Sequence, residues 1–224
     1  MTRQERSEAY LQEHGIKINP RLPETSSVTG IKSGEAILRR AVAALLASQI
    51  ACDLGAGNNV RDSAAFFTKL IYRYHLVDEL TDLERMLFAL ANPEYHAELT
   101  PQDGVQLSWR VEMCMPLFWA CGILKGDMPY PDQPSSIEGL VRVISAAENF
   151  DSLRTLIKMR SDDEILDRAD LICRMDWACV EARLNRTEVG GKLDPDVVME
   201  QHKGLNWIIG AVDAENWDSV QAHT

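Results

Sequence analysis

Apolar residues recur three and four positions apart along nearly the whole chain, whereas the alternation typical of strands is almost absent. This spacing places apolar side chains on one face of a helix. The pattern predicts about eight helices, over residues 4–14, 33–55, 61–74, 81–92, 100–124, a stretch that opens at 135, 161–186 and 195–210. We therefore expect an all-α fold with little or no sheet. It would be a single compact domain over residues 1–224, in which N-terminal helices (1–91) pack with a C-terminal helical core (100–224).

Helix starts are marked by a recurring capping pattern, in which Ser or Thr is followed three residues later by an acid. The hydroxyl accepts a hydrogen bond from a free backbone N–H, and the acid accepts another from the cap residue. Three copies predict helix starts, at Thr81–Glu84, Ser135–Glu138 and Ser161–Glu164. Thr100-Pro101 and Asp194-Pro195 predict two more, because proline fits the first position of a helix.

Glycine and proline predict where helices end or bend. Gly15 and Gly55 close two helices, since glycine readily adopts the left-handed backbone that ends a helix. Asn92-Pro93 stops the helix before it, because proline disfavours helical geometry in the preceding residue. Pro116 lies inside the fifth predicted helix, where it removes one backbone hydrogen bond and should bend the axis.

Size and composition describe an ordinary globular chain. With 224 residues, of which 46% are hydrophobic, about 70% of the extended chain's surface is buried on folding, so stability requires no disulfide or metal. Five cysteines without a C-x-x-C pair predict reduced thiols. The longest uncharged apolar stretches, 41–52 and 113–124, are too short to span a bilayer, and the first fifteen residues lack the apolar core of a secretory signal. We expect a cytoplasmic protein.

The net charge of −11 is unevenly distributed along the chain. Residues 1–80 carry ten Lys/Arg against nine Asp/Glu, whereas residues 81–224 carry 13 against 25. Such a field repels phosphate backbones and anionic membrane surfaces, so we expect neither nucleic acid nor a membrane as a partner. A basic protein would be attracted, although an acidic surface also serves solubility.

The helix predicted after Ser161 carries charges among apolar residues that occupy nearly all of its sides. Apolar residues all round are typical of a helix surrounded by others. Asp170 and Arg174 lie one turn apart and can pair, and Asp176 falls on a stripe of apolar residues. Charges in this setting need partners, because an unpaired buried charge is costly.

The helix predicted after Pro195 also carries polar side chains among apolar ones. His202 lies on its apolar stripe, and Asn206 follows one turn later. A histidine and an amide on an apolar face need hydrogen-bond partners from elsewhere. The charged residues of the preceding helix are the available candidates.

Two interpretations of these polar residues stay open. In the functional one, an aspartate acts as general base or histidine orienter, His202 shuttles the proton and Arg174 holds an anion. In the structural one, which we favour, the residues form a buried network that ties the last helix and the C-terminal tail to the core. The candidate catalytic residues are Asp170, Arg174, Asp176, His202 and Asn206, and the candidate pocket walls are Trp177, Trp207 and Trp217.

No recognised catalytic or nucleotide-binding motif accompanies these residues. The chain has no G-x-x-x-x-G-K-[ST], G-x-G-x-x-G, G-x-S-x-G or H-E-x-x-H sequence. Its five histidines are scattered singly, without metal-ligand spacing. We therefore expect no metal and no cofactor.

Three segments, 159–183, 197–210 and 216–224, carry most of a pattern of residues that matches a known family. The matching residues are Arg160, Ser161, Glu164, Ile165, Asp170, Leu171, Arg174, Trp177, Ala178, Glu200, His202, Leu205, Asn206, Trp207, Trp217, Asp218 and Thr224. With GIKINPRLP at 15–23 and IKSGEAILRRA at 31–41, the chain resembles domain of unknown function 4272, an uncharacterised and mainly bacterial family.

Two residues depart from the family's pattern: Gln201 replaces an arginine and His223 replaces an aspartate. An essential charge at either place would be absent here. The resemblance implies that the unusual polar residues belong to the family's pattern, and it brings no activity with it.

Functions of two classes fit these observations. We expect a non-enzymatic cytosolic protein that binds or regulates another protein through its acidic later part, in the manner of an immunity protein that masks a basic partner. The alternative is a small-molecule enzyme or sensor, such as a hydrolase, with a buried Asp/Arg/His pocket. Self-association into a homo-oligomer also stays open, because a helical stripe does not distinguish a core from an interface.

Overall fold

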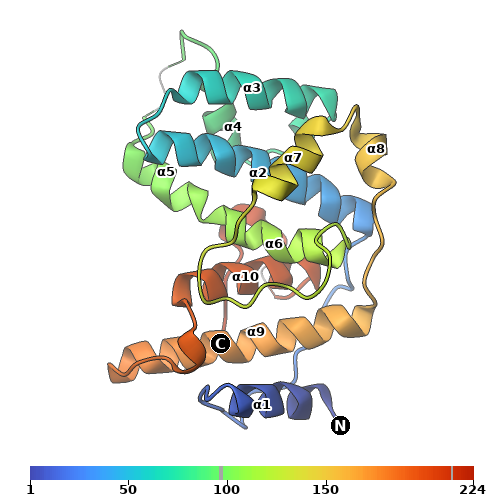
Figure 1. The fold of residues 1–224 in the computed structure, drawn as a ribbon, viewed down its shortest axis with the longest axis vertical. Helices are drawn as coiled ribbons and strands as arrows, with labels where there is room; N and C mark the ends of the chain where they lie inside the picture. Colours follow the sequence, from blue (N-terminus) through green and yellow to red (C-terminus); the bar gives the residue numbers. More distant parts are fainter. Residues whose placement is uncertain (96–97, 213) are drawn as a thin grey trace. The chain divides into compact units, whose positions relative to one another are not determined.

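The computed structural model describes residues 1–95, 98–212 and 214–224. Within these residues the chain forms α-helices and short 3-10 helices and no strand, so the predicted all-α class is confirmed (Figure 1). The α-helices are α1 (Arg3–Glu13), α2 (Gly34–Gly55), α3 (Val60–Arg73), α4 (Asp82–Ala89), α5 (Pro101–Ser108), α6 (Arg110–Ala120), α7 (Glu138–Ala146), α8 (Phe150–Arg154), α9 (Asp162–Asn185) and α10 (Pro195–Ile208). The 3-10 helices are η1 (Val77–Glu79), η2 (Gly190–Lys192) and η3 (Trp217–Ser219).

Residue contacts group the chain into two compact units, each built from separate stretches. The α9 unit comprises Met1–Lys32, Gly126–Ser135 and Arg160–Thr224, and the α2 unit comprises Ser33–Lys125 and Ser136–Met159. Both ends of the chain therefore belong to the unit that contains α1, α9 and α10. The single domain predicted from the sequence stays a prediction.

The predicted caps form at four helix starts. Thr81, Thr100 and Ser161 each complete a capping box, in which the hydroxyl accepts from the third backbone N–H of the helix and the acid there accepts from the cap N–H. Asp194 caps α10 by accepting from two backbone N–H groups of its first turn. Local side-chain chemistry therefore sets these four boundaries.

Helix α7 starts two residues later than the capping pattern predicts. Its N-cap is Ile137, without a side-chain cap bond, so the predicted cap at Ser135 is wrong. The buried face of α7 consists of Leu140 and Ile144, one turn apart. This short amphipathic stretch sets the start, since burial of such a face outweighs a capping preference of about 1 kcal/mol.

The helix predicted over residues 100–124 is divided in two. Helix α5 ends and α6 begins at Trp109, whose carbonyl accepts from the Glu112 N–H in a tight 2.9 Å bond. Pro116 lies inside α6, as predicted. The helix stops before Gly122, whose φ of +67° is incompatible with a right-handed helix.

Helix α2 packs against α3, α4, α5 and α6 and is buried along most of its length. Arg40 of α2 is 4% exposed, and its Nη2 lies 2.6 Å from both carboxylate oxygens of Glu84 on α4. The same carboxylate accepts from the Thr81 backbone N–H at 3.0 Å. One acid therefore caps a helix and neutralises a buried cation.

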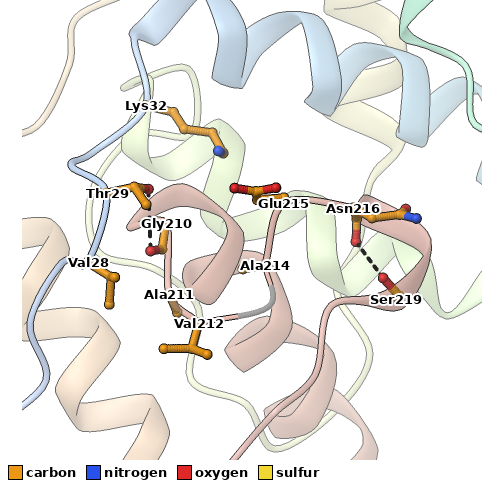
Figure 2. Close-up of a pocket in the computed structure, with 10 residues that line it drawn as sticks. All are labelled: Val28, Thr29, Lys32, Gly210, Ala211, Val212, Ala214, Glu215, Asn216 and Ser219. Atoms are coloured by element: carbon orange, nitrogen blue, oxygen red, sulfur yellow. Dashed lines mark hydrogen bonds between the residues drawn. The ribbon is translucent and has the colours of Figure 1, made fainter.

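Helix α9 packs against α1 and α10 in its unit (Figure 1). The segment before α2 is bonded to the end of α10, where the Lys32 N–H donates to the Ile208 carbonyl at 3.0 Å. Thr29 Oγ1 likewise donates to the Gly210 carbonyl at 3.4 Å (Figure 2). These bonds fix residues far apart in the sequence around the last turn of α10.

Candidate functional site

Asp170 and Arg174 form a buried ion pair on α9. Arg174 Nε donates to Asp170 Oδ2 at 2.8 Å, and the side chains of the two residues are 2% and 1% exposed. Asp170 Oδ1 also accepts from the Thr25 backbone N–H at 2.9 Å. Arg174 Nη2 donates to the carbonyls of Leu22 and Pro23 at 3.4 and 3.3 Å. The pair neutralises its own charges and fixes the loop that follows α1.

The pKa of Asp170 is lowered although the residue is buried. Burial alone would raise this pKa, but hydrogen bonds from Arg174, from the Thr25 backbone and from Ser7 favour the ionised carboxylate. A general base works best with a pKa near the operating pH. The Asp170 carboxylate is therefore better suited to holding Arg174 than to accepting a proton.

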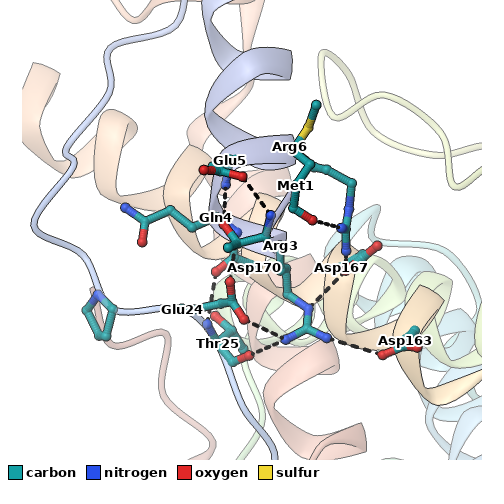
Figure 3. Close-up of polar contacts among 12 residues, drawn as sticks. Met1, Arg3, Gln4, Glu5, Arg6, Glu24, Thr25, Asp163, Asp167 and Asp170 are labelled. Carbon is teal, nitrogen blue, oxygen red and sulfur yellow. Dashed lines mark hydrogen bonds and ion pairs between the residues drawn. The ribbon is translucent and has the colours of Figure 1, made fainter.

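A second set of ion pairs ties α1 to α9 (Figure 3). Arg3 Nε lies 2.9 Å from Asp167 Oδ1, and Arg6 Nη2 lies 2.6 Å from the same oxygen. Arg3 also donates to the Thr25 carbonyl at 3.1 Å and lies 3.4 Å from Glu24. With the Asp170 pair, these contacts form a clamp that joins α1 and the loop after it to α9.

Asp176 of α9 and His202 of α10 form the second buried pair. His202 Nδ1 lies 2.8 Å from Asp176 Oδ2, and His202 and Asp176 are 2% and 3% exposed. Burial lowers the pKa of His202, but hydrogen bonds with Asp176 and Cys173 outweigh burial and raise it from 6.5 to about 9. The ring is therefore protonated at neutral pH, and Asp176 balances its charge. Both side chains point inward and neutralise each other, as their spacing predicts.

Cys173 belongs with this pair, and the sequence reasoning missed it. The residue is partly exposed, and its thiol interacts with His202 strongly enough to contribute to the raised pKa of the ring. A thiol, an imidazole and a carboxylate are the side chains that act as nucleophile, base and orienter in acyl-transfer sites. The available signal was the three-residue spacing between Cys173 and Asp176, which puts both on one side of α9.

The remaining predicted site residues have other partners. Asn206 Nδ2 donates to the Gln221 carbonyl at 2.9 Å and so holds the C-terminal tail. Trp207 and Trp217 pack edge to face, with ring centroids 5.5 Å apart. Trp177 lies partly exposed on α9. Asn206 thus ties the tail to the core in the way that the structural interpretation predicts.

A cavity of about 320 Å³ in the α9 unit has Asp176, Arg183 and Asp196 among its lining residues. Neither His202 nor any of the three candidate tryptophans lines it. Among the described residues, no hydrogen bond or ion pair joins the Asp170 pair to the Asp176 pair. Four of the five predicted polar residues therefore form two separate pairs, and Asp176 of the second pair lines this cavity.

A larger cavity, of about 530 Å³, lies at the end of α10 (Figure 2). We name it the Lys32 pocket; its lining residues are Val28, Thr29, Lys32, Gly210, Ala211, Val212, Ala214, Glu215, Asn216 and Ser219. The sequence does not predict this pocket, because its walls come from two loop segments that carry no catalytic or ligand-binding motif and no helical spacing.

Exposed carboxylates gather where α9 begins. The Arg160 guanidinium donates to the Gly126 carbonyl and lies 3.4 Å from Glu164, so it brings the loop after residue 125 beside the first turn of α9. We name the exposed acids there the acidic α9 end: Asp127, Asp162, Asp163 and Glu164.

Comparisons with known proteins identify a family but no activity. The sequence profile described as Domain of unknown function (DUF4272) matches residues 3–220. No curated protein and no solved structure matches the chain significantly. Among the described helices, none combines the length and apolarity that a membrane crossing requires. The described residues also hold no group of three His, Cys, Asp or Glu side chains placed to bind a metal ion.

Proposed function

The chain belongs to the Domain of unknown function family DUF4272, and from the geometry we propose that it is a non-enzymatic protein that binds a basic protein partner through the acidic α9 end. The role would be regulatory and resemble that of an immunity protein, which masks a basic surface of its partner. A family description that assigns no activity neither favours nor opposes this role.

One observation carries the proposal: interior charges in the α9 unit are paired, while its surface charges are unbalanced. Asp170 is paired with Arg174 and Asp176 with His202, so these groups are already engaged. Among the described residues of the unit, eleven Asp/Glu are exposed against six Lys/Arg. The excess of negative charge therefore lies where a partner can reach it.

Electrostatics makes this surface suited to fast recognition of a cation-rich protein. Like charges gathered at one end raise the local potential and steer an oppositely charged partner toward it. Salt screens such exposed charges over about 10 Å at ordinary ionic strength. Binding should accordingly weaken as the salt concentration rises.

Affinity capture from cell extract at low and at high salt tests the proposal. A triple variant, Asp127→Asn with Asp162→Asn and Asp163→Asn, removes three charges from the acidic α9 end. The matched control removes three exposed acids of the α2 unit, as Asp82→Asn, Glu138→Gln and Glu148→Gln. Asp82 and Glu138 are also first-turn acids, so the control copies the loss of helix-dipole stabilisation.

We expect one basic protein to be captured at low salt by the natural protein and by the control, and to be lost with the triple variant. Its purified form should then bind with an affinity that falls as salt rises. Capture that is equal for the triple variant and the control, or no captured basic protein, contradicts the proposal.

A second candidate, an acyl-transfer hydrolase, is favoured by the grouping of Cys173, His202 and Asp176. In this chemistry the Cys173 thiolate attacks a carbonyl carbon and forms a thioester, and the leaving group takes the proton of the His202 imidazolium. Water then attacks the thioester while His202 takes a proton from that water. The carbon–sulfur bond breaks, and the acid product leaves with the Cys173 thiolate and the His202 imidazolium restored. Asp176 would keep the ring oriented throughout.

The activated ester p-nitrophenyl acetate tests this second candidate. We expect a burst of nitrophenolate and an acetyl group on Cys173, detected by peptide mass spectrometry and absent from Cys173→Ser. The exposed Cys52 supplies the control, because its thiol is accessible and has no such histidine among the causes of its pKa. Acetylation that is no faster at Cys173 than at Cys52 contradicts a hydrolase role.

A further inference from the structure

The Lys32 pocket has a preformed frame. Gly210 has a φ of +59°, and a Cβ atom there would lie 2.0 Å from Thr29 Oγ1, so a larger residue would strain the backbone and displace the Thr29 side chain. Ser27 Oγ donates to the Ile209 carbonyl at 2.7 Å and accepts from the Gly30 N–H at 2.8 Å. These contacts hold the two pocket-forming segments together without a ligand.

Lys32 brings a cation into this frame. Its Nζ lies 4.8 Å from the ring centroid of Trp207, which orients the ammonium through a cation–π interaction. In the described residues no carboxylate forms an ion pair with it. An ammonium has three donors, so this group has capacity left for an anionic ligand group.

Glu215 brings the opposite charge to the same pocket. Its carboxylate and the Lys32 ammonium both extend into the pocket in Figure 2. No ion pair joins the two groups in the described residues. A gap between opposite charges is suited to a ligand that carries both signs.

Apolar side chains lie at the other end of the pocket lining, where Val28 and Val212 are separated from the charged groups by Thr29 and Gly210 in Figure 2. Val28 and Val212 are 61% and 66% exposed, and Ala214, which also lines the pocket, is buried. The volume of about 530 Å³ lies in the range of small-molecule sites and exceeds the need of a single small ion. The pocket therefore offers a cation, an anion and an apolar wall together.

We propose that the Lys32 pocket binds a small apolar zwitterion of the α-amino acid or dipeptide class. The ligand carboxylate binds the Lys32 ammonium, and the ligand ammonium binds the Glu215 carboxylate. The ligand side chain packs against Val28 and Val212. This site is separate from the acidic α9 end and does not depend on the function proposed above.

Titration calorimetry with L-leucine and L-leucyl-L-leucine tests the proposal. N-acetyl-L-leucine lacks the ammonium and L-leucinamide lacks the carboxylate. Each analogue should bind at least about tenfold more weakly, since a hydrogen bond to a charged group is worth about 1.5–3 kcal/mol.

Two variants should weaken zwitterion binding to a similar extent: Lys32→Met, which keeps the apolar stem, and Glu215→Gln. The controls are Lys192→Met and Glu188→Gln, which change exposed residues outside the pocket lining and should leave binding unchanged. Because Glu215 is exposed, its variant tests the proposal even if Lys32→Met impairs folding.

Absence of calorimetric binding for both zwitterions at millimolar concentrations would overturn the proposal. Equal binding of the zwitterions and the two analogues, or equal binding by Glu215→Gln and Glu188→Gln, would also overturn it.

Discussion

The Asp176–His202 pair makes the stability of the protein depend on pH in a defined direction. The pKa of His202 is raised from 6.5 to about 9 in the folded state, so its stabilising contribution is fully present below pH 6.5. As pH rises from 6.5 through 9, the folded protein holds a proton that the unfolded chain has released, and this contribution is lost. The pKa difference corresponds to roughly 3 kcal/mol of unfolding free energy.

Asp176→Asn removes the charge that keeps the ring protonated. The buried ring then favours its neutral form, because burial by itself lowers the pKa of His202. Breaking a buried pair by removing one partner costs about 3–5 kcal/mol. We therefore expect the variant to be markedly less stable than the natural protein below pH 6.5, and the two stabilities to converge as pH rises through 9.

Urea denaturation at a series of pH values between about 6 and 9.5 measures the unfolding free energy of the natural protein and of Asp176→Asn. The difference between the two cancels the contributions of other titrating groups. His223→Gln is the control, because His223 is an exposed histidine whose loss should leave the curve of the natural protein unchanged. A difference between natural protein and Asp176→Asn that stays constant across this range refutes the reasoning. So does a natural protein whose stability rises over the same range.

Three further predictions follow from other contacts. Arg174→Met should lower the unfolding free energy by about 3–5 kcal/mol in urea denaturation, because it leaves the buried Asp170 carboxylate without its cation, and a loss below about 1 kcal/mol would contradict the clamp. Ser161→Ala should cost about 1 kcal/mol by the same measurement, since it removes the α9 cap, and an unchanged midpoint would contradict that role. Native titration with Ellman's reagent should modify exposed Cys52 well before Cys114, whose pKa burial raises, and simultaneous reaction would contradict the packing around α6.

Much of the fold follows from local sequence chemistry. The caps at Thr81, Thr100 and Ser161 form as predicted because a hydroxyl and an acid three residues apart satisfy backbone groups without help from the rest of the chain. Ser135 shows the limit of this reasoning, since α7 begins where its apolar face begins. The short helix α8 escaped prediction because five residues give too little periodicity to detect.

Part of the candidate site was predictable, because charged side chains on the apolar face of a helix need partners. Asp176 and His202 lie on apolar stripes, so they had to find each other or another partner, and they do. Cys173 was missed because a thiol on a helix surrounded by others is usually a small hydrophobe. The Lys32 pocket could not be predicted from the sequence. Its walls are loops that fold back on the end of α10, and loop conformation produces no periodic pattern of apolar residues.

The buried charges of α9 and α10 face inward and neutralise each other in two pairs, Asp170 with Arg174 and Asp176 with His202. Nitrogen-15 NMR of the His202 ring tests this central claim most directly, because the two ring nitrogens report protonation separately. At neutral pH the account predicts that both nitrogens carry protons, that the ring titrates near pH 9, and that Asp176→Asn converts it to the neutral form. A ring that is neutral at pH 7 in the natural protein, or that titrates near 6.5 like an exposed histidine, would contradict the claim.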